Sequence, residues 1–202
     1  MKQVYAARPI NTYRHSVSAS VGDAYIAWLG EQYPEAKIID PNSPEISAHA
    51  DKLVEKARIN PETGEEDEAY FNQYGSAKVM KYFTEEVVLP CNVGTGLMLP
   101  MKEGVFGVGA GVAAELAKMN NLGRPVFLVG FFKDMRFEKH HIIGLDVRET
   151  IDSVSNKPLY SFHTYDGARY YQLSVDETRA RMYTSKPDGG WDRNNLQPYF
   201  LA

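Results

Sequence analysis

The chain has 202 residues, of which 44% are hydrophobic and 24% charged, so it is long and apolar enough to bury a sizeable core. Its formal net charge of -4 argues against broad binding to DNA or RNA, which requires a basic face. No apolar run reaches the roughly 18 residues of a membrane-spanning helix, and the single Cys91 excludes an intrachain disulfide. The sequence therefore predicts a cytoplasmic protein that binds neither a membrane nor a nucleic-acid polymer.

Hydrophobic periodicity predicts alternating strands and helices over the first three quarters of the chain. Strands are expected at residues 3–7, 36–40, 96–101, 124–130 and 140–147, and helices at 18–33, 45–58, 66–90 (broken at Gly75-Ser76) and 111–121. Such alternation is typical of a parallel sheet that is covered by helices on both faces. The loops after the strands then share one edge of the sheet, where ligands bind. Those loops are residues 8–15, 40–43 and 101–111.

The last quarter of the chain has a different pattern. Asp166-Gly167 separates two aromatic, alternating runs within residues 158–173, which predicts a β-hairpin. Ser174 and Glu177 have the spacing of a capping box, so a short helix is expected next, followed by an aromatic tail. We therefore expect an α/β domain over residues 1–150 and a C-terminal hairpin, short helix and tail over 151–202.

The stretch GVFGVGAGVAAELAK, residues 104–118, allows two interpretations. It could be the phosphate-binding turn of a dinucleotide site, but that fingerprint follows a strand directly, and residues 102–106 intervene here. Alternatively, the bend places Glu115 near the positive end of a helix, which favours an ionised carboxylate. Such a carboxylate among small residues can attack a sugar carbon that carries positive charge. A glutamate that only stabilises the helix is the structural alternative.

Two short motifs resemble the nucleoside deoxyribosyltransferase superfamily, which includes the deoxynucleoside 5'-monophosphate N-hydrolases. VYAARP at residues 4–9 is similar to the opening strand of that family. GVAAELA at 111–117 is similar to its nucleophile segment, with Ala117 in place of the usual glycine. The resemblance covers roughly residues 3–130. It implies a flavodoxin-like (Rossmann-like) parallel five-stranded sheet with helices on both faces, here with a C-terminal hairpin-helix extension.

The resemblance also implies an enzyme that cleaves N-glycosidic bonds, is a homo-oligomer and needs no metal or organic cofactor. Glu115 would be the nucleophile that forms a glycosyl-enzyme ester, and Tyr5 would orient Glu115 or the sugar. Water or a second base would complete hydrolysis or transfer. The expected substrate is a nucleoside or a nucleoside 5'-monophosphate, since arginine forks match phosphate geometry. The residues expected to bind it are Ala7, Arg8, Pro9, Asn11, Arg14, Ser16, Gly109 and Gly111.

One feature departs from the family pattern, because Pro90-Cys91-Asn92 lacks the aspartate that usually contacts the sugar or the leaving base. Asn92 can form a hydrogen bond in its place, and Glu103 could protonate the leaving base or be a surface acid. This absence keeps open a second hypothesis, a catalytically silent module that binds or sequesters a nucleotide. A metal site at His140-His141 is not favoured, because adjacent strand residues point to opposite faces.

Overall fold

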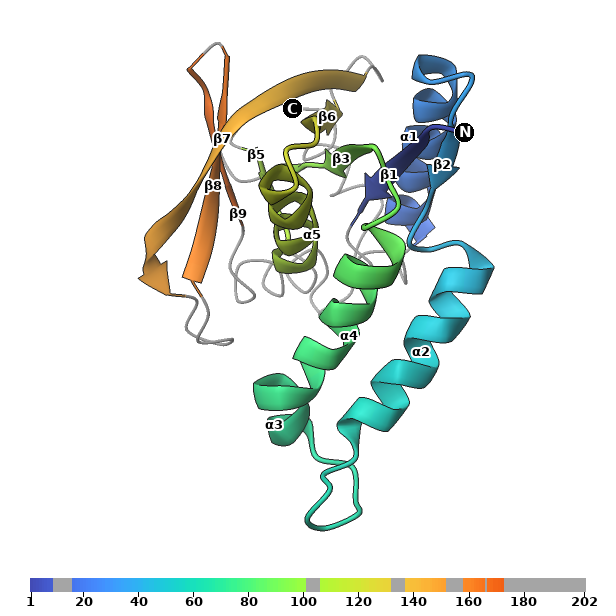
Figure 1. Ribbon diagram of the computed structural model, residues 1–202, viewed down its shortest axis with the longest axis vertical. Coiled ribbons are helices and arrows are strands. Elements are labelled where there is room, and N and C mark those ends of the chain that lie inside the picture. The colour runs from blue at the N-terminus through green and yellow to red at the C-terminus, as the bar shows by residue number, and fades with distance from the viewer. Residues whose placement is uncertain (9–15, 101–105, 132–136, 152–157, 166, 173–202) are drawn as a thin grey trace.

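One mixed sheet of nine strands organises the part of the chain that the structure describes (Figure 1). This computed structural model describes residues 1–8, 16–100, 106–131, 137–151, 158–165 and 167–172. The strands are β1 (Gln3–Ala7), β2 (Lys37–Ile39), β3 (Val93–Leu97), β4 (Leu99–Pro100), β5 (Phe106–Val108), β6 (Val126–Phe131), β7 (Phe137–Ile151), β8 (Pro158–Thr164) and β9 (Arg169–Gln172). The helical segments are α1 (Ser16–Gln32), α2 (Pro44–Arg58), α3 (Glu68–Tyr70), η2 (Phe71–Gly75), α4 (Ser76–Tyr82), η3 (Phe83–Val87) and α5 (Ala110–Asn121).

The strand order is β2-β1-β3-β6-β7-β8-β9-β5-β4, and its two halves differ in direction. Strands β2, β1, β3 and β6 pair in parallel, whereas β7, β8 and β9 continue the sheet antiparallel. The expectation of a five-stranded, parallel, flavodoxin-like sheet is therefore wrong. Only residues 132–136 separate β6 from β7, and a parallel connection needs a crossover of about a dozen residues or more. The strand expected at 140–147 therefore runs back beside β6.

Helices cover both faces of the parallel half of the sheet. On one face, Tyr25 and Leu29 of α1 pack with Ala6 of β1. On the other face, Leu116 of α5 packs in the same cluster as Tyr5 of β1, because successive residues of a strand point to opposite sides. Helix α5 also contacts β7 and η3, and Figure 1 shows it between the β7–β8–β9 strands and α4. The core beside Tyr5 is therefore closed by α5.

Several expected elements are confirmed, and two are wrong. The strands expected at 3–7, 36–40 and 124–130 are β1, β2 and β6, and the helices expected at 18–33, 45–58 and 111–121 are α1, α2 and α5. The strand expected at 96–101 is wrong as a single element, since this range contains the end of β3 (Val93–Leu97) and the separate short strand β4 (Leu99–Pro100). The break expected at Gly75-Ser76 is also wrong, because Gly75 has helical dihedral angles (φ -66°, ψ -40°) between η2 and α4.

Two glycines of β3 explain both its sequence and its closeness to α5. A Cβ built on Gly94 would lie 2.7 Å from the Met119 sulfur atom, and one built on Gly96 would lie 2.6 Å from a methyl carbon of Leu116. Because glycine has no side chain, α5 lies closer to β3 than it could with any other residue at these two positions. Gly94 is the register partner of Tyr5, so this close approach occurs beside Tyr5 itself.

The hairpin expected around Asp166-Gly167 is confirmed by the antiparallel pairing of β8 with β9. Gly167 has φ 81°, a backbone conformation that favours glycine. Strand β7 crosses residue 150 and pairs with β8, so the hairpin continues the sheet of the first domain. The helix expected after Ser174 and the aromatic tail lie outside the described residues. Within the described ranges, no helix has both the length and the apolar character needed to cross a membrane.

We predict that Gly75→Ala destabilises the protein and that Gly30→Ala does not. A Cβ on Gly75 would lie 2.3 Å from the backbone oxygen of Ala57, so α2 and η2 would have to separate, at a cost of about 1–3 kcal/mol. Gly30 is an exposed position of α1 with open space where a Cβ would lie, and helix propensity favours alanine there by about 0.5–1 kcal/mol. Urea unfolding of both variants measures the difference. Equal stability of the two variants would contradict the close contact.

Candidate active site

Glu115 is a buried acid on the face of α5 that packs against the sheet. The residue is only 4% exposed. Helix α5 begins at Ala110 after the N-cap residue Gly109, so Glu115 is its sixth residue and lies beyond the first turn. The expected effect of the positive helix end is therefore weak here, because that effect falls off within the first turn.

Burial controls the charge of Glu115. It raises the pKa of this carboxyl group from its ordinary 4.5 to about 8, and the neighbouring Tyr5 hydroxyl partly opposes it by lowering the pKa. No cation among the described residues contributes to this balance. Glu115 is therefore mostly protonated at neutral pH in the free protein, which is opposite to the ionised state expected from its place in the helix.

Tyr5 places a buried hydroxyl group beside Glu115. The residue is fully buried in β1, and its hydroxyl group makes no hydrogen bond of standard geometry with the described residues. It nevertheless lies close enough to Glu115 for each group to alter the pKa of the other. Burial first, and then the charge of Glu115, raise the pKa of Tyr5 well above its ordinary 10.0. The site thus contains a neutral hydroxyl beside a carboxyl group that titrates near neutral pH.

Arg8 and Asp40 form a bidentate ion pair at the end of the neighbouring strands. Arg8 Nε lies 2.8 Å from Asp40 Oδ1, and Arg8 Nη2 lies 2.6 Å from Asp40 Oδ2. The third guanidinium nitrogen is 3.7 Å from the exposed carboxylate of Asp23. Asp40 also accepts a hydrogen bond from the backbone N–H of Asn42. Because Arg8 follows β1 and Asp40 follows β2, this pair joins the carboxyl ends of two adjacent parallel strands.

The structure brings some of the predicted site residues together and separates one. Tyr5 lies in the middle of β1, Ala7 ends the strand and Arg8 follows it, and Glu115 on α5 is close enough to Tyr5 to alter its pKa. Asn92 lies at the opposite edge of the sheet, where its side-chain oxygen accepts a hydrogen bond from the backbone N–H of Gln3. Asn92 therefore helps to begin β1 and β3, at a distance from their carboxyl ends.

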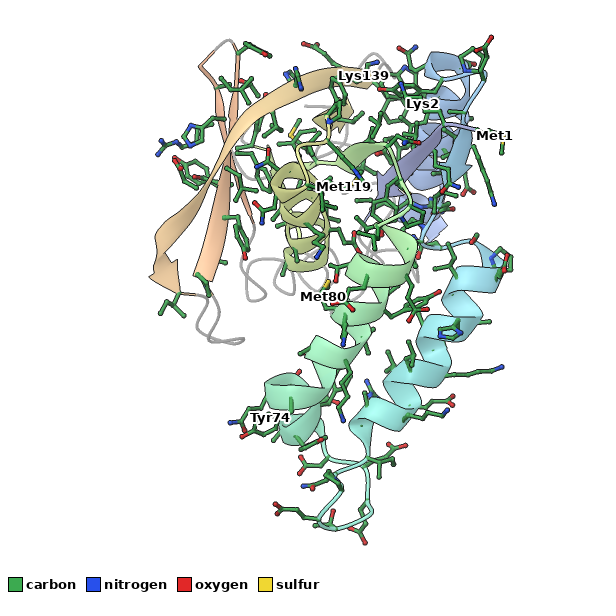
Figure 2. The ribbon with its side chains drawn as sticks, viewed as in Figure 1. Met1, Lys2, Tyr74, Met80, Met119 and Lys139 are labelled. Atoms are coloured by element: carbon green, nitrogen blue, oxygen red, sulfur yellow. The ribbon has the colours of Figure 1, made fainter. Side chains whose placement is uncertain are left out.

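Gly109 and Gly111 of the glycine bend lie in the described part of the chain, whereas four other predicted site residues lie outside it. Gly109 and Gly111 stand at the start of α5, and Met80 extends from α4 toward Gly111, with 3.7 Å between its terminal carbon and a Cβ built there (Figure 2). Pro9, Asn11, Arg14 and Glu103 lie outside the described residues. The backbone of Ser16 begins α1, but its side chain is outside the described part.

Asp40 is the residue of this edge that the sequence did not single out. Its side chain is 18% exposed, and its charge contributes to the raised pKa of Tyr5. The available signal was an acid that directly follows the strand expected at 36–40. That signal identifies a partner for Arg8 only when β2 is known to lie next to β1.

His140 and His141 point in different directions, as expected for neighbours on a strand. His141 stacks on Phe127 with 4.8 Å between ring centroids, whereas His140 packs at 5.3 Å from Tyr170. Across the described ranges, no group of three or more His, Cys, Asp or Glu side chains is arranged to hold a metal ion.

We predict that Glu115→Gln removes a pH dependence of stability. Between pH 4.5 and about 8, the folded protein keeps a proton on Glu115 that the unfolded chain has lost. The free energy of unfolding of the wild type therefore falls as pH rises, by at most about 1.4 kcal/mol per pH unit. The amide has no such proton, so the variant gains stability relative to the wild type over this range.

Urea unfolding at a series of pH values measures this effect. Glu55→Gln, at an exposed position of α2, controls for the change of carboxyl to amide. A stability difference between wild type and Glu115→Gln that stays constant across the range would show that burial does not raise the pKa of Glu115.

Comparison of the chain with models of known protein families, with curated proteins and with solved structures gave no match. The likeness to the deoxyribosyltransferase superfamily therefore rests on the two short motifs at residues 4–9 and 111–117. The function that it implies stays a prediction.

Proposed function

We propose that this protein cleaves or transfers at the N-glycosidic bond of a nucleoside or nucleoside 5'-monophosphate, with Glu115 as the nucleophile. The observation that carries the proposal is the buried contact between Glu115 on α5 and Tyr5 on β1. A carboxyl group removed from water, with no cation among the described residues to neutralise it, is poised to respond to positive charge on a bound substrate. The two motifs that resemble the superfamily contain these same two residues.

The reaction proceeds by two displacements at the anomeric carbon of the sugar. An oxygen of the ionised Glu115 forms a bond to that carbon while the carbon–nitrogen bond breaks, and the electron pair of that bond leaves with the base. The departing base takes up one proton from solvent, which replaces the one that Glu115 released to solvent on ionising, so the protons balance. Water or a second base then displaces Glu115 from the opposite side, which restores the original configuration of the sugar.

Burial of Glu115 favours the transition state more than the free protein. As the base departs, the sugar becomes an oxocarbenium-like cation beside the carboxylate. Charges attract strongly in surroundings from which water is excluded, so a buried carboxylate gains more from this cation than an exposed one would. Once Glu115 is ionised, the neighbouring Tyr5 hydroxyl, which has no standard hydrogen bond with a described residue, would donate to the carboxylate and hold the attacking oxygen in place. Interactions that strengthen only as charge develops lower the barrier.

The remaining parts of the proposal follow from the resemblance and the composition. The displacement uses side chains alone and needs no metal or organic cofactor. Arg14 and Ser16 would hold the 5' side of the substrate, and the protein would act as a homo-oligomer. A single buried cysteine, Cys91, is in keeping with a reducing cytoplasm.

A silent module that binds or sequesters a nucleotide is the second candidate. Two observations favour it: Glu115 is mostly protonated at neutral pH, and two nitrogens of the Arg8 fork are already occupied by Asp40. A neutral carboxyl group is a poor nucleophile, and it can act as a hydrogen-bond donor to a bound ligand instead.

We predict that the wild type releases free base from at least one member of a panel of nucleosides and 5'-monophosphates, and that Glu115→Gln does not. The amide keeps the size of the side chain and removes the nucleophile, so we expect a loss of at least about 1,000-fold in kcat/KM. Chromatographic detection of the base provides the measurement, and Glu55→Gln should keep wild-type activity. Tight binding of one panel member without base release would instead support the silent module.

We predict that kcat/KM for base release rises with pH and levels off above about pH 8. The nucleophile must be ionised, and the free protein holds its proton up to that pH. Tyr5→Phe removes the hydroxyl group that lowers the pKa of Glu115, so the rise should move to higher pH in this variant. A pH profile that falls over this range would exclude Glu115 as an ionised nucleophile.

A further inference from the structure

Two buried hydroxyl groups connect α1 to the backbone of Tyr5. The hydroxyl of Tyr25 donates to Thr95 Oγ1 over 2.7 Å, and Thr95 Oγ1 donates to the backbone oxygen of Tyr5 over 2.8 Å. All three residues are fully buried. They come from three elements, α1, β3 and β1, that are far apart in the sequence.

These hydroxyl groups lie where apolar side chains would serve stability as well. The surrounding cluster between α1 and the sheet contains Ala6, Val21, Leu29, Leu97 and Val129. A buried hydroxyl loses its hydrogen bonds to water, and the bond that it regains contributes only about 0.5–1.5 kcal/mol net. Replacing both partners of such a bond with apolar groups of the same shape is nearly neutral. The benefit of the connection is therefore directional, because hydrogen bonds fix positions that apolar contacts leave adjustable.

The position that this connection fixes is that of Tyr5. The Tyr5 side chain faces α5, while Thr95 holds the Tyr5 carbonyl from the α1 side, so the residue is anchored on the face opposite to Glu115. Its hydroxyl makes no standard hydrogen bond with a described residue, so its place beside Glu115 depends on the backbone from which the rigid ring extends. The other titratable groups that act on Tyr5 are Cys91 and Asp40.

We propose that Tyr25 and Thr95 are positioning residues that hold the Tyr5 hydroxyl against the carboxyl group of Glu115. The meaning of this role for catalysis rests on the proposed function, but the effect on Glu115 does not. Tyr5 is the titratable group among the described residues that acts directly on Glu115, where it lowers the pKa. If the Tyr5 ring were displaced, burial would act on the Glu115 pKa without the opposing effect of Tyr5, and the carboxyl group would keep its proton to still higher pH.

The experiment follows the ionisation of Glu115 by NMR, using ¹³C-labelled glutamate and Glu115→Gln to identify the signal. Thr95→Val and Tyr25→Phe keep the shape of each side chain and remove one hydroxyl, and the double variant removes both. Thr95→Ser is the matched control, because it keeps the hydroxyl group. We expect the Glu115 pKa to rise in both single variants and in the double variant, as it does in Tyr5→Phe, and to stay unchanged in Thr95→Ser.

Stability separates positioning from packing. Thr95→Val removes the acceptor of the buried Tyr25 hydroxyl and should unfold at lower urea concentration, whereas the double variant, which also removes that hydroxyl, should recover most of that loss. A double variant with recovered stability and an altered Glu115 pKa supports the proposal. An unaltered Glu115 pKa in the double variant overturns it, and so does an equal shift in Thr95→Ser.

Base release tests the same residues in catalysis and keeps the two proposals distinguishable. We expect kcat to fall about 10-fold to 100-fold in the double variant with little change in KM, because the attacking oxygen is misplaced and the substrate contacts remain. Absence of base release by the wild type would remove the proposed function, and the NMR titration would still decide whether Tyr25 and Thr95 position Tyr5. Wild-type kcat in the double variant would overturn the positioning role in catalysis.

Discussion

The close packing of α5 on β3 brings the helix that carries Glu115 against the strand that pairs with β1. Gly94 and Gly96 present only backbone to the helix, and Met119 and Leu116 fill the space that their side chains would occupy (Figure 2 labels Met119). Because Gly94 is paired with Tyr5, a larger residue there would push the helix away from the strand that carries the hydroxyl. This close approach contributes to the burial that raises the pKa of Glu115.

The two acids of this region differ in what neutralises them. Asp40 is paired with Arg8 through two short contacts, whereas Glu115 has, among the described residues, only the Tyr5 hydroxyl and is neutral at rest. A buried cation near Glu115 would stabilise its ionised form and weaken its attraction for a substrate cation. The positive charge of Arg8 is instead paired with Asp40. A carboxyl group that is mostly neutral at rest and ionises more readily beside positive charge fits the proposed reaction, whose transition state creates such charge.

Much of the fold could be predicted from the sequence, but its antiparallel half and the charge of Glu115 could not. Apolar periodicity locates α1, α2 and α5 because it reflects which face of a helix is buried. Periodicity carries no information about strand direction, which at β7 depends on the short connection 132–136. The glycines of β3 resemble a turn in the sequence, and only their contact with α5 shows why they suit a strand. A motif can therefore single out Glu115 as a candidate nucleophile, but its protonation depends on packing that no local pattern encodes.

The position of β5 distinguishes the two interpretations of the glycine bend. A dinucleotide-binding turn joins a strand to a helix that returns to a neighbouring parallel strand, so that the phosphates lie between them. Here β5 precedes α5 directly, yet its neighbours in the sheet are β9 and β4, and α5 leads into β6 between β3 and β7. The strands before and after α5 are thus far apart in the sheet, and these two described strands form no crevice of the dinucleotide type between them. What the bend does achieve is to bring a chain from the far side of the sheet onto the glycines of β3, with Glu115 on the buried face of the helix.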